Sequence, residues 1–93
     1  MTDSLTRRRF IVSGRVQGVG FRWAVRDWAE RLELRGWVRN QPDGTVAAEA
    51  QGPAPAVAEF ARRLRVGPQG ARVDAVETTD LEAVGGPACF DIL

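Results

Sequence analysis

The chain has 93 residues, 44% of them hydrophobic, and a formal net charge of +1 at pH 7. This length fits one domain over residues 1–93, with a polar and disordered tail at residues 1–6. One cysteine and no histidine exclude an internal disulfide framework, a Cys/His zinc site and imidazole catalysis, and the lack of lysine excludes Schiff-base and Walker-type lysine chemistry.

The first half of the chain predicts a strand, a glycine-rich loop, a helix and a hairpin. β-Branched residues indicate a strand over residues 7–13. Apolar residues at helical spacing indicate a helix over residues 21–34, with Gly36 placed to end it. Two further strands, at residues 36–40 and 45–51, are separated by a Pro-Asp-Gly tight-turn sequence and form a hairpin.

The second half predicts another helix and two more strands. Gly52-Pro53 opens the helix and Gly67-Pro68 ends it. Strands follow at residues 71–79 and 88–93. The order β-α-β-β-α-β plus a terminal strand predicts an α+β fold, a ferredoxin-like sandwich with one antiparallel sheet and both helices on one face.

This topology brings two distant parts of the chain together. In a split βαβ arrangement the first two strands run parallel, with the third between them. The chain therefore leaves the first strand at Gly14 and the second at Asn40 at the same edge of the sheet.

The loop at residues 15–20 has the properties of an anion site. Its backbone N–H groups and the amino end of the following helix attract an anion, and Arg22 is placed to clamp it. Residues 7–39 contain nine arginines and three acidic residues, a net charge of +6. Trp23 stands where the dinucleotide motif needs its third glycine, and no nearby acidic pair suits magnesium. The loop therefore predicts a small anion held without a metal.

Two longer sequences carry a family resemblance. Residues 14–22 read Gly-Arg-Val-Gln-Gly-Val-Gly-Phe-Arg, and residues 36–40 read Gly-Trp-Val-Arg-Asn, followed by Asp-Gly-Thr-Val at residues 43–46. They resemble the two signatures of the acylphosphatases. The resemblance extends over nearly the whole chain, through Gln51-Gly52-Pro53, Phe60, Leu64, Gly67-Pro68 and Phe90-x-Ile92.

The resemblance implies a ferredoxin-like hydrolase that cleaves the carboxyl-phosphate bond of acyl phosphates such as acetyl, aminoacyl or phosphoglyceryl phosphates. It assigns phosphoryl binding to Arg22 and orientation of the attacking water to Asn40. Gln41 departs from the Thr or Ser of many relatives, which we expect to change the rate rather than abolish activity. The backbone expected to bind phosphate belongs to Arg15, Val16, Gln17, Gly18, Val19, Gly20 and Phe21.

The residue types fit this substrate class independently. The carboxylate leaving group of an acyl phosphate has a low pKa, so it needs no strong acid for its departure. An arginine, backbone amides and one side-chain amide can supply positioning and charge stabilisation. We therefore expect no metal and no cofactor, and we hypothesise that a phosphate oxygen of the substrate accepts the proton of the water.

Other functions remain open from the sequence. Asn40 could simply start the turn that follows it, and the chain could be a catalytically idle relative, like the acylphosphatase-like segment of hydrogenase-maturation proteins. Ferredoxin-like sheets also bind RNA through strand aromatics, but residues 45–51 contain none.

The expected partners are an acyl phosphate substrate and inorganic phosphate, the product and a competitive inhibitor. We expect no nucleic acid, no membrane, a monomer and a cytoplasmic location. Cys89 is expected to be buried and inert. Trp23, Trp28 and Trp37 are expected to belong to the core rather than to a substrate platform, and of the three Trp23 is the one expected to be partly exposed.

Overall fold

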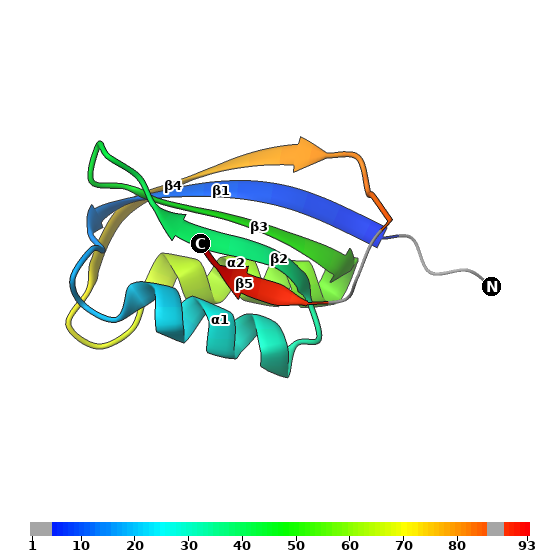
Figure 1. Ribbon diagram of the computed structural model, residues 1–93, viewed down its shortest axis with the longest axis horizontal. Coiled ribbons are helices and arrows are strands. Elements are labelled where there is room, and N and C mark those ends of the chain that lie inside the picture. Colours follow the sequence, from blue (N-terminus) through cyan, green and yellow to red (C-terminus); the bar gives the residue numbers. More distant parts are fainter. Residues whose placement is uncertain (1–4, 86–88) are drawn as a thin grey trace.

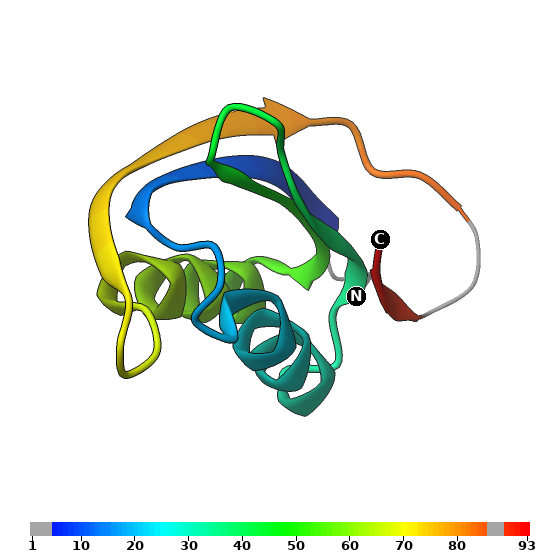
Figure 2. The ribbon, with the colours of Figure 1, turned by 60° about the vertical axis from the view of Figure 1, so that its left-hand side comes forward.

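Five strands form one curved sheet, and both helices pack on the same face of it (Figure 1, Figure 2). The computed structural model describes residues 5–85 and 89–93. Its elements are β1 (Leu5–Arg15), α1 (Phe21–Arg31), β2 (Arg35–Asn40), β3 (Val46–Pro53), α2 (Ala54–Val66), β4 (Arg72–Leu81) and β5 (Phe90–Ile92). The predicted α+β ferredoxin-like sandwich is confirmed.

The strand order β4-β1-β3-β2-β5 brings two loops together. β1 and β2 both pair antiparallel with β3, which lies between them, so β1 and β2 run in the same direction. Their carboxyl ends therefore lie at one end of the sheet. Figure 1 shows the β1–α1 loop and the β2–β3 hairpin together at this end.

The sheet is mixed rather than wholly antiparallel, because β5 runs parallel to β2. β4 is antiparallel to β1 and ends where β1 and β2 begin. Residues 82–85 follow β4 at this end of the sheet, and β5 starts there beside the start of β2, so it runs in the same direction as β2. Gln51 binds residue 84 of this segment: its side chain accepts a hydrogen bond from Val84 N at 2.9 Å and donates one to Val84 O at 2.8 Å.

The core lies between the sheet and the two helices. Phe60 of α2 packs against Phe10 of β1 and Phe90 of β5, with ring centroids 5.6 Å and 5.9 Å apart. Val25 and Ala29 of α1 are fully buried against the same core. Burial of these apolar side chains fixes α1 to the sheet, and with it the loop that precedes α1.

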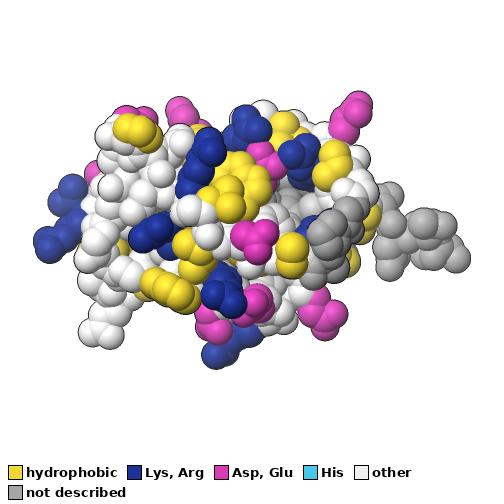
Figure 3. Space-filling view, in the orientation of Figure 1, with side chains coloured by type: hydrophobic (Ala, Val, Ile, Leu, Met, Phe, Trp, Pro, Cys, Tyr) yellow, Lys and Arg dark blue, Asp and Glu magenta, His cyan; other side chains and the backbone are white. Residues whose placement is uncertain are grey.

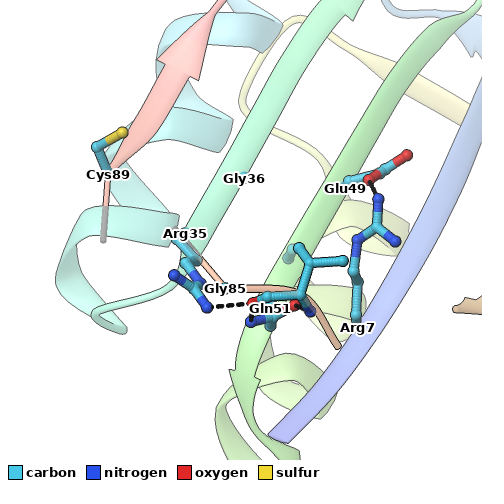
Figure 4. A pocket seen from close by; sticks show the side chains of 9 residues that line it. Arg7, Arg35, Gly36, Glu49, Gln51, Gly85 and Cys89 are labelled. Atoms are coloured by element: carbon cyan, nitrogen blue, oxygen red, sulfur yellow. Dashed lines mark hydrogen bonds and ion pairs between the residues drawn. The ribbon is translucent and has the colours of Figure 1, made fainter. Parts of the chain in front are cut away.

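The other face of the sheet carries a buried ion-pair cluster. Glu49 of β3 is only 4% exposed and pairs with Arg9 at 2.7 Å and with Arg7. Figure 4 shows the Arg7–Glu49 pair beside a cavity that Gln51 and Gly36 also line. This cavity lies at the end of the sheet opposite the β1–α1 loop.

Some sequence predictions of element boundaries are wrong. β1 already begins at Leu5, so residues 5 and 6 belong to a strand rather than to a tail; residues 1–4 lie outside the described part of the chain. α1 ends at Arg31 instead of continuing to residue 34, because Glu33 takes a left-handed φ of 57° and breaks the helical hydrogen-bond pattern.

Gly36 lies inside β2 and does not end α1. A Cβ at this position would approach Glu49 O to 1.8 Å, so the glycine is needed for close contact between β2 and β3. The prediction for Cys89 is also wrong: its side chain is exposed. Phe90 takes the buried position at the start of β5, and alternation along the edge strand leaves Cys89 outside.

Candidate active site

The β1–α1 loop turns sharply at two glycines. Gly18 and Gly20 have φ values of 74° and 75°, in the left-handed region that favours glycine. A Cβ at either position would meet no atom within 4 Å, so the backbone conformation, not lack of space, requires glycine. Gly20 is also the N-cap of α1, and no side chain in the described part of the chain caps this helix end. The first amides of α1 are therefore open to a ligand.

A cavity of about 270 Å³ lies at this helix end. Arg22 comes from the first turn of α1, and Asn40 is the last residue of β2. Both line the cavity, together with Val16, Gly18, Gly20, Phe21 and Trp23. The parallel run of β1 and β2 thus brings the arginine and the asparagine of the two sequence motifs to one cavity.

Arg22 has no ion-pair partner within residues 5–85 and 89–93. Many other arginines of the chain are paired with carboxylates, such as Arg26 with Glu30 on the same helix. The side chain of Arg22 is partly buried, so its charge is less screened than on an open surface. Its guanidinium is therefore available to an anion in the cavity.

The loop is held to the β2–β3 hairpin by a side chain. Gln17 Nε2 donates hydrogen bonds to the carbonyl oxygens of Gln41, at 2.8 Å, and Thr45, at 2.9 Å. Gln41 N in turn donates to Thr45 O at 2.8 Å and closes the hairpin. Gln41 follows Asn40 directly, so this link connects the loop to the strand end that carries the asparagine.

The hairpin turn has its own local support. Thr45 donates to Asp43 Oδ1 from its backbone N, at 3.0 Å, and from its hydroxyl, at 2.6 Å. These hydrogen bonds, chiefly the one from the hydroxyl, lower the pKa of the Asp43 carboxyl. The Asp-Gly-Thr sequence of the second motif thus stabilises the turn beside the cavity.

The predicted loop residues divide into two groups. Val16, Gly18, Gly20 and Phe21 line the cavity, and Val16 and Phe21 are also buried in the core. Arg15, Gln17 and Val19 belong to the loop region but do not line the cavity; Val19 packs against the core and Arg15 is exposed.

Sequence reasoning missed two contributions to this site. It assigned only the backbone of Gln17, whereas the side chain makes the link to the hairpin. The only indication of this role in the sequence is the position of Gln17, whose amide side chain stands between Val16 and Gly18 in a short loop. It also favoured the core over a substrate-contacting position for Trp23, which is wrong, because Trp23 is 64% exposed and lines the cavity. Only its expectation that Trp23 is the most exposed of the three tryptophans is confirmed.

The predicted positions of the other two tryptophans differ in outcome. Trp28 packs partly buried against the core, as expected. The expectation for Trp37 is wrong: it lies partly buried on the face of the sheet away from the helices, where the guanidinium of Arg39 lies 4.9 Å from its ring centroid.

No three His, Cys, Asp or Glu side chains among the described residues are grouped as a metal site. No helix of the described chain is long and apolar enough to cross a membrane.

Comparison with known proteins identifies the family. The acylphosphatase family model matches residues 8–92. The chain is 52% identical over 90 residues to the acylphosphatase of Nitratidesulfovibrio vulgaris, covering 95% of this chain and 90% of that protein. It is 48% identical over 86 residues to that of Anaeromyxobacter dehalogenans, covering 92% of each. The crystal structure of acylphosphatase from Bacillus subtilis matches with a TM-score of 0.91 and 38% identity, over 97% of this chain and 99% of that one. The chain belongs to the acylphosphatase family of enzymes.

Proposed function

We propose that this chain hydrolyses the carboxyl-phosphate bond of acyl phosphates in the cavity between α1 and β2, with Arg22 and Asn40 as its catalytic residues and without a metal ion. The observation that carries the proposal is that Arg22 and Asn40 line one cavity with the glycine loop. The family supports acyl phosphate hydrolysis in general, and the following steps assign it to these residues.

Arg22 and the loop bind the phosphoryl group. A guanidinium can donate two parallel hydrogen bonds to phosphate oxygens. The open amides at the amino end of α1 and the positive end of its dipole add to the attraction. Because charge on the phosphoryl oxygens must be stabilised in the transition state, these donors accelerate the reaction as well as bind.

Asn40 orients the nucleophile. Its side-chain oxygen can accept a hydrogen bond from water and its nitrogen can donate one, which fixes the position of the water. The water oxygen forms a bond to phosphorus while the bond from phosphorus to the acyl oxygen breaks. The carboxylate leaves with the electron pair, and a phosphoryl oxygen takes the proton of the water.

The chemistry of the substrate makes a metal unnecessary. A departing carboxylate is stable as an anion at neutral pH, because its conjugate acid has a pKa of about 4. Among the described residues that line the cavity, the polar groups are the guanidinium of Arg22, the side-chain amide of Asn40, the indole N–H of Trp23 and backbone amides. This set suits an activated phosphate better than an unactivated phosphate ester.

Hydrolysis of benzoyl phosphate in the presence of EDTA tests the proposal. We expect turnover that chelation does not reduce and that inorganic phosphate inhibits competitively. Loss of turnover with EDTA, restored by a divalent cation, would contradict metal independence. Phosphate binding without any turnover would support the alternative, a catalytically idle phosphate-binding domain.

The proposal also includes a monomer without a nucleic-acid partner in the reducing cytoplasm. The large exposed apolar side chains of the described residues are scattered, and Figure 3 shows small apolar patches among charges of both signs on one face. On the sheet face away from the helices, Arg7 and Arg9 are engaged by Glu49. The exposed thiol of Cys89 suits a reducing compartment. Sedimentation analysis and an RNA titration would test these points.

A further inference from the structure

Trp23 is more exposed to solvent than the other aromatic side chains of the chain. The chain has four phenylalanines and three tryptophans, all within the described part. The phenylalanines are buried in the core, and Trp28 and Trp37 are partly buried. Trp23 is 64% exposed.

The fold does not use this side chain for packing. The buried face of α1 consists of Phe21, Val25 and Ala29. Trp23 lies off this face, and its large apolar ring is left in contact with water, which is unfavourable for folding. A polar residue would fit this helix position at least as well.

The position of Trp23 relative to the cavity suggests its use. It follows Arg22 in the first turn of α1, and both residues line the cavity with Asn40. If the glycine loop and Arg22 hold the phosphoryl group, the attacking water and the acyl group lie on opposite sides of phosphorus. The acyl group must then extend along a wall of this small cavity, and Trp23 supplies an apolar wall beside Arg22.

The indole ring is restrained in its exposed position. The guanidinium of Arg26 lies 5.8 Å from the ring centroid, within the range of a cation–π contact. Arg26 is itself held by Glu30, at 3.4 Å. A ring that is already ordered loses less entropy when a ligand stacks on it.

We propose that Trp23 forms a subsite for the acyl group and favours aromatic acyl phosphates over acetyl phosphate. This inference rests on the proposed function for the placement of the phosphoryl group in the cavity. Stacking of an aryl ring on tryptophan adds an apolar contact that an acetyl group is too small to make. Trp23 is therefore a specificity-determining residue.

Isothermal titration with two non-hydrolysable analogues, benzoylphosphonate and acetylphosphonate, tests the subsite apart from catalysis. The wild type should bind benzoylphosphonate about three- to tenfold more tightly than acetylphosphonate. Trp23→Ala should remove this preference, and Trp23→Phe should keep part of it. In both variants the affinity for acetylphosphonate and for inorganic phosphate should change less than the affinity for benzoylphosphonate. Leu5→Ala, which truncates an exposed apolar side chain at the far end of β1, should keep the full preference.

Equal affinity of the wild type for the two phosphonates, or a preference that survives in Trp23→Ala, would overturn the subsite. The same variants can be compared in hydrolysis, where Trp23→Ala should raise the KM for benzoyl phosphate more than the KM for acetyl phosphate. A wild type that binds benzoylphosphonate preferentially but hydrolyses neither acyl phosphate would support the subsite and refute the proposed function. Failure of the Trp23 subsite and failure of the proposed hydrolysis therefore give different experimental results.

Discussion

The side-chain amide of Gln17 donates a hydrogen bond of 2.8 Å to the carbonyl oxygen of Gln41, the residue that follows Asn40. A second bond, of 2.9 Å, reaches Thr45 O across the hairpin. Together they fix the glycine loop relative to the end of β2. The relative position of Arg22 and Asn40 therefore depends on a residue that does not line their cavity.

Substitution of Gln17 by alanine should reduce activity through geometry. We expect kcat to fall about 10- to 100-fold, because displacement of a catalytic group by about 1 Å has effects of this size. The free energy of unfolding should fall by about 1–3 kcal/mol, since two hydrogen bonds are lost while each carbonyl oxygen keeps one backbone donor, Gly44 N for Gln41 O and Gln41 N for Thr45 O. Steady-state kinetics and urea unfolding of the same variant measure both effects. An unchanged kcat with only the stability loss would show that the link is structural alone.

The glycines at Gly18 and Gly36 should respond differently to alanine. The new methyl group of Gly18→Ala would meet no neighbouring atom, and the only unfavourable effect is the positive φ at this position. We therefore expect the free energy of unfolding to fall by about 1–2 kcal/mol. Gly36→Ala would place a methyl group against Glu49 O and should separate β2 from β3. We expect the free energy of unfolding to fall by more than about 3 kcal/mol. Thermal and urea unfolding compare the two. Equal effects would contradict this account of why each glycine is present.

The buried carboxylate of Glu49 should stabilise the fold only in combination with its arginines. Glu49→Ala removes the carboxylate partner of both Arg7 and Arg9, although Arg7 keeps its hydrogen bond to Glu82 O, so we expect the free energy of unfolding to fall by about 2–4 kcal/mol. Glu59→Ala is the matched control, since Glu59 forms exposed pairs with Arg62 and Arg63 on α2; we expect a loss below about 1 kcal/mol. Urea unfolding measures the free energy of unfolding of both variants. Similar losses in Glu49→Ala and Glu59→Ala would contradict the expected difference between the buried and the exposed ion pairs.

The hairpin turn should be acid-sensitive. The pKa of Asp43 is lowered from its usual 3.8 by the hydroxyl and backbone N of Thr45, so the folded state binds this proton more weakly than the unfolded state. The stabilisation is therefore present above the unfolded pKa and is lost as the pH falls through the folded value. Wild type should lose its stability advantage over Asp43→Asn progressively as the pH falls below the usual carboxyl pKa of 3.8. The free energy of unfolding of both proteins is measured as a function of pH, and a difference that stays constant with pH would contradict this prediction.

Much of the fold could be predicted from local sequence patterns. Helical spacing in α1 and the Pro-Asp-Gly turn indicated their elements directly, and the parallel relation of β1 and β2 followed from element order. The end of α1 was predicted wrongly because Glu33 adopts a left-handed conformation that local propensity does not favour. The direction of β5 depends on where β4 ends, which is a property of the whole sheet.

The candidate site was predictable only in part, because a sequence pattern does not give the directions of side chains in the folded chain. Arg22 and Asn40 stand in two long motifs, and the topology explains why they meet. The side-chain bonds of Gln17 and the place of Trp23 on the cavity wall depend on side-chain direction in the folded chain. A sequence pattern gives residue types and spacing but not such directions, so only the structure could assign these two residues.

The most direct test of the central claim is to compare kcat and the affinity for inorganic phosphate in Arg22→Ala and Asn40→Ala, with Arg65→Ala, on the exposed end of α2, as control. If Asn40 orients water, Asn40→Ala should lower kcat for benzoyl phosphate at least about 100-fold and leave phosphate affinity nearly unchanged. Arg22→Ala should lower both, and Arg65→Ala neither. Undiminished turnover in Asn40→Ala or Arg22→Ala would contradict the account.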